Sequence, residues 1–441
     1  MYNMEYVPLS SIAEVNPSVS TNHLFDNLPV SFIPMSDVTE AGQWICHQER
    51  QFKDLSGQGY TLFQEGDILF AKITPCMENG KGAHAIGLIN SIGFGTTEFH
   101  VLRVKFGNKA RFLYHWLQSD SLRLKAEALM TGSAGQRRVT PKFFDIYYIP
   151  SLSPSEQQHI AHILDTLDTQ IQQTEKLIAK LKQVKVGLLH DLLTQGIDEN
   201  GDIRDPVAHP EEFKEVSFLQ KRIKIPKKWE IQPLHSLLTG IDAGKSPNCP
   251  DQPAGAGDWG VLKVSAVHPS GFRAEENKVI INTAYINTAY EVQDGDLLIS
   301  RANTYELVGI VCLVKSPRTH LLLCDKTLRL HINIKNALSK FIFYILQMSF
   351  VRSQIGMHAT GSSGSMKNIS QNSIKNLSVY VPPLEEQQKI ITILNALDAR
   401  IATEESDLAK LKQIKKGLMH DLLTGRVRVT HLIAEREHLS I

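Results

Sequence analysis

The sequence predicts an α+β protein in which two globular regions are separated by two long helices. The helices are expected to pair as an antiparallel coiled coil, with a pseudo-two-fold internal repeat. Three observations predict this fold. Residues 156–194 and 386–424 match at 23 of 39 positions without a gap. Both segments repeat apolar residues with a period of 3.5. About 150 residues with short apolar runs and turn-forming residues precede each segment, which indicates strands.

Weaker matches at an offset of 229 extend the repeat into the globular regions. Gly66-Asp67-Ile68-Leu69 corresponds to Gly295-Asp296-Leu297-Leu298, and Thr131-Gly132-Ser133 corresponds to Thr360-Gly361-Ser362. The chain is therefore one unit present twice.

Six segments follow from the repeat. They are a first globular region (1–152), a first repeated helix (153–196), a linker (197–228), a second globular region (229–382), a second repeated helix (383–425) and a C-terminal tail (426–441). The linker contains GIDENGDIRDP and IPKKW, whose Gly, Asp and Pro residues end the helix and let the chain turn back. Each globular region is expected to contain a substantial sheet and one late helix, at residues 111–128 and 340–357.

The repeated helices carry a narrow stripe of alternating four- and three-residue spacing, and eight of its ten positions are apolar in each copy. In the first copy these positions are Ile160, Leu164, Leu167, Ile171, Thr174, Ile178, Leu181, Lys185, Leu188 and Leu192. In the second they are Ile390, Leu394, Leu397, Ile401, Glu404, Leu408, Leu411, Lys415, Leu418 and Leu422. A stripe of this period favours a partner helix of the same period, and both copies leave their globular regions in the same sense, so the pair is predicted to be antiparallel. The alternative is that each helix lies on its own domain.

Composition sets limits on function. The 47 basic and 46 acidic side chains give a net charge of +1, which by itself indicates no polyanion ligand. Five cysteines without a Cys-x-x-Cys motif support neither a disulfide framework nor a zinc site. No window reaches the ~18 apolar residues of a membrane helix, so a cytoplasmic protein without membrane contact is expected.

The near-neutral total conceals an alternating distribution of charge. Residues 1–98 carry a net charge of −7 and residues 99–144 carry +7. Residues 230–325 carry −4, and residues 326–384 carry +7. One basic region per globular region is expected if each contacts the phosphates of a nucleic acid, although uneven surface charge without a ligand is the alternative.

The basic regions contain loops of small residues with Arg, Gln, Lys and Asn, whose side chains suit base edges and phosphates. Further polar residues follow the two Gly-Asp strands at equivalent positions. The predicted DNA-contacting residues are Lys72, Thr74, Ser133, Gln136, Arg137, Arg138 and Lys142 in the first copy, and Arg301, Asn303, Thr304, Ser362, Ser363, Ser365, Lys367 and Asn368 in the second. Ordinary turns are the alternative interpretation of these loops.

Catalytic motifs are weak. Gly255–Gly260 matches G-x-G-x-x-G but precedes an apolar run typical of a strand, whereas a dinucleotide or S-adenosylmethionine loop precedes a helix. Asp251 with Glu276 and Lys278 resembles the carboxylate set with which many nucleases hold magnesium, but the first copy has no counterpart. His159 and His162 lie one helical turn apart, yet their repeat counterparts are Lys389 and Thr392, so a solvated face is favoured over a metal site. No catalytic residue and no metal ligand is therefore predicted.

The repeated motifs resemble the specificity subunit of type I restriction-modification systems over essentially the whole chain. The resemblance is carried by VPPLEEQQKI (381–390), KKGLMHDLLTG (415–425), their first-copy forms PSEQQHI (154–160) and KVGLLHDLLT (185–194), and the linker sequence GIDENG (196–201). Ser151-Leu152-Ser153 stands where the family favours a Pro-Pro pair.

This resemblance implies that each globular region is a target recognition domain for one half of a bipartite, asymmetric site in double-stranded DNA. It implies that the helices set the spacing of the half-sites and that their apolar seam residues also dock two modification subunits, which use S-adenosylmethionine to methylate adenine. Restriction subunits would supply the ATP- and Mg-dependent motor and nuclease, and this chain would be non-catalytic and bind no cofactor. A nuclease or fused modification enzyme built on Asp251, Glu276 and Lys278 is the alternative function. A coiled-coil adaptor without DNA contact is a third.

Overall fold

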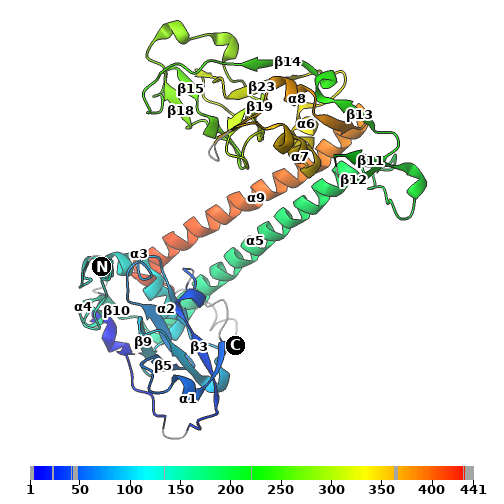
Figure 1. Cartoon of the computed structure of the whole chain (residues 1–441). Coiled ribbons are helices and arrows are strands. Elements are labelled where there is room, and N and C mark those ends of the chain that lie inside the picture. Colours follow the sequence, from blue (N-terminus) through cyan, green and yellow to red (C-terminus); the bar gives the residue numbers. More distant parts are fainter. Residues whose placement is uncertain are drawn as a thin grey trace. The chain divides into compact units, whose positions relative to one another are not determined.

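The computed structural model describes residues 4–21, 24–40, 42, 48–133, 135–219, 221–361, 366–430 and 432. The chain forms two compact units. Unit 1 comprises Met1–Leu177 with Glu404–Ile441, and unit 2 comprises Ile178–Thr403. Each unit therefore contains one globular region and one half of each of two long helices, α5 (Pro154–Thr194) and α9 (Leu384–Leu423) (Figure 1).

Unit 1 is built around two four-stranded sheets. The main sheet consists, in order, of β2 (Ala13–Val15), β9 (Phe99–Val104), β6 (Ile68–Ala71) and β7 (Gly82–His84). The second sheet consists of β4 (Gln48–Gln51), β3 (Pro29–Ile33), β8 (Ile92–Gly95) and β5 (Thr61–Gln64). A small pair joins β1 (Tyr6–Pro8) to β10 (Tyr148–Pro150). The helices are α1 (Phe52–Leu55), α2 (Ala110–Gln118), α3 (Asp120–Ala128) and α4 (Phe143–Ile146).

Unit 2 repeats the main sheet of unit 1. Its strands are, in order, β14 (Leu238–Ala243), β23 (Thr327–Ile332), β19 (Leu297–Ser300) and β21 (Val311–Leu313). A three-stranded sheet contains β18 (Asn277–Val279), β15 (Gly260–Leu262) and β22 (Leu321–Leu322). The strand pairs are β13 (Glu230–Pro233) with β25 (Ser378–Val381), β16 (Val267–His268) with β17 (Gly271–Phe272), and β20 (Ala302–Asn303) with β24 (Lys367–Asn368). The shorter helices are α6 (Ser339–Ile345), α7 (Ser349–His358) and α8 (Gln371–Lys375).

Strand β6 shows why its sequence is a continuous apolar run. Alternate side chains of a strand point to opposite faces of the sheet. Ile68 and Phe70 pack into a core shared with α2 and α3, whereas Leu69 and Ala71 pack into a core shared with the second sheet. Both faces are therefore covered, and all four residues are buried.

The two predicted late helices are wrong as continuous helices, because each is broken into two. Ser119 separates α2 from α3, and its hydroxyl accepts a hydrogen bond from the Leu122 N–H at 3.4 Å. A serine at this position satisfies a free N–H at the start of the new helix. In unit 2, residues 346–348 separate α6 from α7.

The segment predicted as a linker contains a β-hairpin. Strands β11 (Phe213–Phe218) and β12 (Lys221–Pro226) pair in antiparallel register. Phe218 and Ile225 join the main core of unit 2, next to the buried Trp229. The hairpin is thus part of the folded unit.

Gly196 ends the turn after α5 in a position that requires glycine. Its φ is +69°, in the left-handed region that side chains with a Cβ rarely adopt. A Cβ there would lie within 2.6 Å of atoms of Glu386, Arg204 and Trp229. The closeness of these groups shows how tightly the end of α5 packs against the start of α9.

The coiled-coil seam is confirmed. All twenty seam positions are buried or half-buried, and most of the positions between them are exposed. Within unit 1, Asp168 pairs with Lys415 and Glu175 pairs with Lys412 at 2.8 Å, so residue numbers rise along α5 as they fall along α9. The helix halves are therefore antiparallel (Figure 1).

The polar seam lysines are paired in the same way in both units. In unit 2, Lys185 Nζ lies 2.5 Å from Asp398 Oδ1, and in unit 1 Lys415 contacts Asp168 Oδ1. Lys185 and Lys415 are repeat equivalents, as are Asp168 and Asp398. A polar seam residue with one partner specifies helix register at some cost in stability. These pairs therefore fix how the helices are aligned.

Buried glutamines at the start of each long helix attach the globular regions. Gln157 Oε1 accepts a hydrogen bond from the Lys109 N–H at 2.9 Å, and Gln387 Oε1 accepts one from the Leu338 N–H at 2.9 Å. Lys109 and Leu338 are the residues that precede α2 and α6. Each glutamine thereby satisfies a free N–H at the start of a helix of its globular region.

An ion pair joins the start of one long helix to the segment that follows the other. In unit 2, Arg204 Nη1 donates to Glu386 Oε1 at 2.6 Å, and the same oxygen accepts from the Ile197 N–H at 2.9 Å. In unit 1, Arg428 Nε donates to Glu156 Oε1 at 2.7 Å. Glu156 and Glu386 are repeat equivalents.

Removing one partner of the unit 2 pair is expected to destabilise the unit strongly, because the Arg204 and Glu386 side chains are only 10% and 9% exposed. We expect Glu386→Ala to lower the free energy of unfolding by about 3–5 kcal/mol. Glu215, which is 56% exposed and paired with Arg222, gives the matched control. Glu215→Ala should change it by no more than ~0.5 kcal/mol. Urea denaturation followed by circular dichroism measures both, and equal effects would contradict the assignment.

Candidate DNA interface

Three segments that are far apart in the sequence meet beside the main sheet of unit 1. The Lys72 N–H, just after β6, donates to the Glu98 carbonyl at 2.9 Å, just before β9. The Val139 N–H donates to the Lys72 carbonyl at 2.9 Å, and the Thr74 N–H donates to the Arg137 carbonyl at 3.1 Å. The loop after α3 is thereby held against the end of β6.

Unit 2 repeats this arrangement with different residues. The Arg301 N–H donates to the Lys326 carbonyl at 2.8 Å, and the Ile369 N–H donates to the Arg301 carbonyl at 2.9 Å. Strand β20 pairs with β24, which places Ala302 opposite Asn368 and Asn303 opposite Lys367. The loop after α7 therefore lies against the end of β19.

These main-chain hydrogen bonds define equivalent positions in the two units. We call them the strand-end clusters. The first strand-end cluster is Lys72, Glu98, Arg137 and Arg138, and the second is Arg301, Lys326, Lys367 and Asn368, in corresponding order. The fold thus brings predicted DNA-contacting residues together at the same place in each unit, while the side chains differ.

In the first cluster Arg138 and Glu98 form a two-pronged ion pair. Arg138 Nε donates to Glu98 Oε2 at 2.9 Å, and Nη2 donates to Oε1 at 2.8 Å. The hydrogen bonds from Arg138 hold the pKa of Glu98 below its usual range, so its carboxylate is ionised at neutral pH. Arg137 Nη2 reaches the Glu127 carbonyl at 3.4 Å. Thr74 donates through Oγ1 to Glu78.

In the second cluster the polar side chains make mainly local contacts. Lys367 Nζ donates to the Gly361 carbonyl at 2.8 Å. Asn303 Oδ1 accepts from the Thr304 N–H at 2.9 Å. The side chain of Asn368 is exposed, and Arg301 is half-buried.

The remaining predicted DNA-contacting residues are only partly placed. Ser133, Gln136 and Lys142 are exposed, the first two in the loop after α3 and the third just before α4. Ser362, Ser363 and Ser365 lie outside the described residues.

Glu98 and Lys326 belong to the clusters although they were not among the predicted residues. Both directly precede a strand of the main sheet, β9 or β23. The charge pattern indicates basic side chains, so it does not predict the acidic Glu98. Lys326 is the first residue of the second basic region, but no sequence motif surrounds it.

The seam residues were predicted to dock partner subunits, but their side chains face the other helix. A partner subunit would therefore contact a different surface of the helices. Val184 and Ile414, which are repeat equivalents on α5 and α9, are 47% and 50% exposed. They are apolar residues on the outer surface of the helix pair. A partner that docks on the helices would contact such residues.

The predicted alternatives for catalysis do not assemble into sites. Residues 255–260 lead directly into β15, a strand, so no helix N-terminus is available for a phosphate or carboxylate. Asp251 Oδ1 contacts Lys263 at 3.0 Å and Lys278 at 3.4 Å, and Glu276 Oε2 accepts from Ser265 at 2.6 Å. The ammonium groups of two lysines therefore neutralise Asp251.

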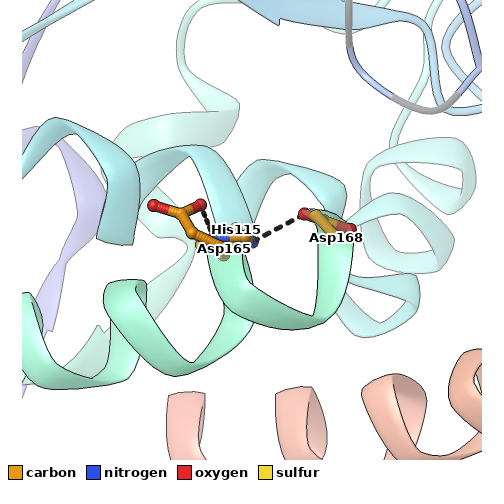
Figure 2. Close-up of side chains that lie close together, drawn as sticks. All are labelled: His115, Asp165 and Asp168. Atoms are coloured by element: carbon orange, nitrogen blue, oxygen red, sulfur yellow. Dashed lines mark hydrogen bonds and ion pairs between the residues drawn. The ribbon is translucent and has the colours of Figure 1, made fainter. Parts of the chain in front are cut away.

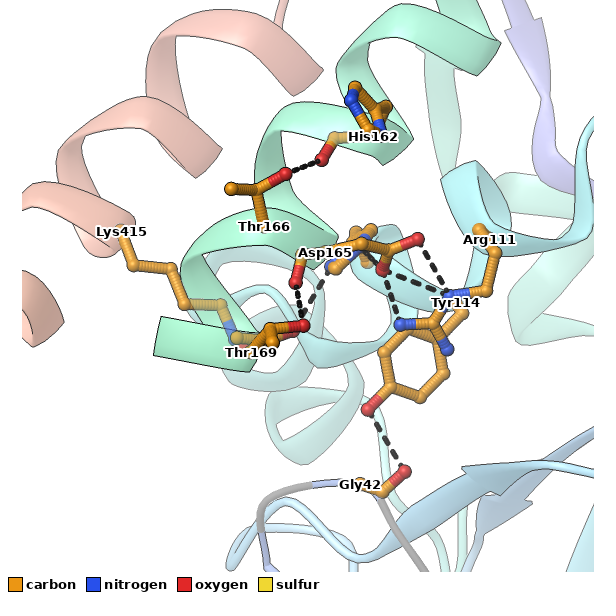
Figure 3. Close-up of polar contacts among 10 residues, drawn as sticks. Gly42, Arg111, Tyr114, His162, Asp165, Thr166, Thr169 and Lys415 are labelled. Atoms are coloured by element: carbon orange, nitrogen blue, oxygen red, sulfur yellow. Dashed lines mark hydrogen bonds and ion pairs between the residues drawn. The ribbon is translucent and has the colours of Figure 1, made fainter. Parts of the chain in front are cut away.

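His115, Asp165 and Asp168 come close enough to raise the question of a metal site (Figure 2). His115 Nε2 lies 2.8 Å from Asp165 Oδ1, and His115 Nδ1 lies 4.0 Å from Asp168 Oδ2. However, Arg111 donates to both oxygens of Asp165, and Lys415 contacts Asp168 (Figure 3). Two cations already balance the two carboxylates, so the group suits a structural network rather than a metal ion.

This network joins three helices of unit 1. Arg111 and His115 lie on α2, Asp165 and Asp168 on α5, and Lys415 on α9. Figure 3 labels Arg111, Asp165 and Lys415. Burial alone would raise the pKa of Asp165, but hydrogen bonds from His115 and Arg111 outweigh it and hold that pKa well below its usual range. The network therefore fixes α2 on the helix pair.

Unit 2 has a related network at equivalent positions. Lys340 donates to Asn395, and the Tyr344 hydroxyl donates to Asp398 Oδ2 at 3.4 Å. Lys185 pairs with the same aspartate. Each globular region is thus attached to both long helices by polar contacts as well as by its core.

Among the described residues, no helix is long and apolar enough to cross a membrane.

Comparison with known proteins identifies the class to which this duplicated fold belongs. The family model described as "Type I restriction modification DNA specificity domain" matches residues 1–183 and 226–413, which is more than half of the chain. The chain therefore belongs to this family, and it is a DNA-recognition subunit of the type I restriction-modification class.

Individual similar proteins are specificity subunits of type I restriction enzymes. The type I restriction enzyme EcoEI specificity subunit of Escherichia coli is 29% identical over 459 residues, covering 88% of this chain and 77% of that protein. The EcoAI specificity subunit of Escherichia coli is 41% identical over 159 residues, covering 35% of this chain and 26% of that protein. A crystal structure of the type I restriction-modification system S subunit from M. genitalium matches the fold with a TM-score of 0.54 at 14% identity, covering 96% and 97% of the two chains. These comparisons give the nuclease alternative no support.

Half-buried His84 and buried His115 predict that unit 1 is sensitive to acid. Burial lowers the pKa of His84 to about 4 and also lowers the pKa of His115. An unfolded chain binds these protons near pH ~6.5. The free energy of unfolding should therefore fall as the pH drops from about 6.5 towards 4, because the unfolded state binds more protons.

Urea denaturation at pH 7 and pH 5 tests this. We expect His84→Gln to reduce the loss of stability between the two pH values by about 1–2 kcal/mol. His358→Gln, at an exposed position in unit 2, is the matched control. The same pH dependence in the wild type and the His84 variant would show that His84 does not contribute.

Proposed function

We propose that each globular region binds one half of a bipartite, asymmetric sequence in double-stranded DNA. The observation that carries this proposal is the pair of strand-end clusters. They occupy equivalent positions in two repeated folds, yet one presents Arg138 with Glu98 and the other presents Asn368 with Lys326. A shared framework with different base-contacting side chains is what two related readers of different half-sites require.

The paired helices then set the spacing between the half-sites. Their register is fixed by the ion pairs of Lys185 with Asp398 and of Lys415 with Asp168. DNA makes one turn in about 10 base pairs, so half-sites that move along the duplex also rotate around it. A rigid spacer accepts one gap length and rejects others.

The partners of the chain follow from the same assignment. Two modification subunits dock on the helices, with Val184 and Ile414 as apolar contacts on the outer surface. Those subunits bind S-adenosylmethionine and flip and methylate adenine. Restriction subunits bring ATP- and Mg-dependent motor and nuclease activity. The chain itself is non-catalytic, binds no cofactor and acts in the cytoplasm, where the DNA is.

Exchange of one globular region tests whether each globular region recognises its own half-site. Residues 1–150 are replaced by the corresponding region of a relative that recognises a different sequence, and the hybrid is produced with its modification partner. We expect methylome sequencing to show one new half-site, with the other half-site and the gap unchanged, since the second cluster is untouched. The reciprocal exchange of residues 229–382 is the matched control.

Two results would contradict the proposal. A change in both half-sites, or in neither, would show that the globular regions do not read independently. An adaptor without DNA contact predicts a complex whose DNA affinity is undetectable, whereas a DNA reader binds with an affinity that falls steeply as salt rises.

A further inference from the structure

We infer that Arg138, held in position by Glu98, reads a guanine in the half-site bound by the first globular region. Arg138 is the specificity-determining residue and Glu98 is a positioning residue. The inference rests on the proposed function, because it assigns one base contact within the interface. After its hydrogen bonds within the chain, Arg138 still has N–H donors with which it can contact a base.

The guanidinium group of arginine has five N–H donors. Glu98 takes one on Nε and one on Nη2, at 2.9 and 2.8 Å. The Gln136 carbonyl takes one on Nη1 at 3.1 Å. One N–H therefore remains on each terminal nitrogen, and the two nitrogens lie side by side at the tip of the side chain.

Two adjacent donors match the edge that guanine presents in the major groove. Guanine offers two neighbouring acceptors there, O6 and N7, and a forked contact from arginine is the commonest specific contact to them. The Arg138 side chain is 40% exposed, so its tip is accessible while its inner edge is engaged by Glu98. The pair therefore presents donors in a fixed orientation.

The place of Glu98 in the fold explains its role. Its carbonyl accepts from the Lys72 N–H, and the next residue begins β9, so its main chain is fixed by the sheet. An isolated carboxylate beside DNA would be repelled by the phosphates, but here it is neutralised by Arg138. Fixing the arginine before binding reduces the conformational entropy lost when the complex forms.

The second unit provides a natural comparison. Asn368 occupies the position of Arg138, and Lys326 occupies the position of Glu98. Asn368 is exposed and uncharged, so it needs no acidic partner. The residue at the position of Glu98 is Lys326, not an acid. Asparagine suits the N6 and N7 groups of adenine rather than guanine. The two half-sites are therefore expected to differ at the base contacted from this position.

The experiment determines base preference with the specificity and modification subunits assembled. Methylome sequencing gives the wild-type site, and binding of the purified complex is then measured on duplexes with each base of the site replaced in turn. The variants are Arg138→Gln, Arg138→Lys and Glu98→Gln. Asn368→Ala is the matched control in the second unit, and Lys142→Ala removes an exposed cation four residues after Arg138.

We expect Arg138→Gln to reduce the preference for guanine at one position of the first half-site by about 5- to 150-fold. Arg138→Lys, which keeps the charge but loses the fork, should reduce the same preference with a smaller loss of overall affinity. Glu98→Gln should weaken preference at that same base only. Asn368→Ala should change the second half-site alone, and Lys142→Ala should weaken binding to all sequences equally.

Several results would overturn the inference. One is an equal loss of affinity on every duplex in the Arg138 variants, which would make Arg138 a phosphate contact. Another is a wild-type first half-site without guanine. Failure of both Arg138 variants to assemble would assign the ion pair to stability. The proposed function is tested separately by the wild-type recognition site. That proposal fails only if the site is not divided between the two globular regions.

Discussion

The seam between α5 and α9 is the interaction on which the rest of the structure depends. Two copies of one helix meet in opposite directions, so the Lys415–Asp168 pair of unit 1 has a counterpart in the Lys185–Asp398 pair of unit 2. Apolar residues supply the attraction, and the Lys185–Asp398 and Lys415–Asp168 pairs exclude other alignments because a shifted register would leave these charges half-buried without partners. The duplication of the sequence thereby becomes a defined pairing within one chain.

Each globular region is attached to this helix pair by more than a flexible connection. The main core of unit 2 continues from its sheet into Leu192, Ile390 and Leu394 of the long helices, and a core of unit 1 includes Ile160, Leu164 and Leu422. Buried glutamines and charged networks then fix the direction of the first helix of each globular region. Each strand-end cluster consequently belongs to a globular region that is packed on the helix halves of its own unit.

The sequence was sufficient to predict the long helices and their antiparallel pairing, because a period of 3.5 over some 39 residues leaves few alternatives. It also named Arg138 and Asn368 among the residues predicted to contact DNA, and the structure brings these two residues to equivalent positions in the two units. It did not predict Glu98 as the partner of Arg138, since contacts between residues 40 positions apart depend on strand order, which local patterns do not specify. The break at Ser119 was missed because α2 and α3 have compatible apolar patterns, and the hairpin of residues 213–226 was hidden by its many charged residues.

We propose that the helix pair sets the distance between two DNA-binding globular regions, and insertion of one heptad into both α5 and α9 tests this most directly. Seven residues keep the seam in phase and lengthen each helix by about 10 Å, the length of about three base pairs of DNA. Methylome sequencing of the variant with its modification partner should then show both half-sites unchanged and a longer unread gap. A methylated site with the original gap would contradict the account.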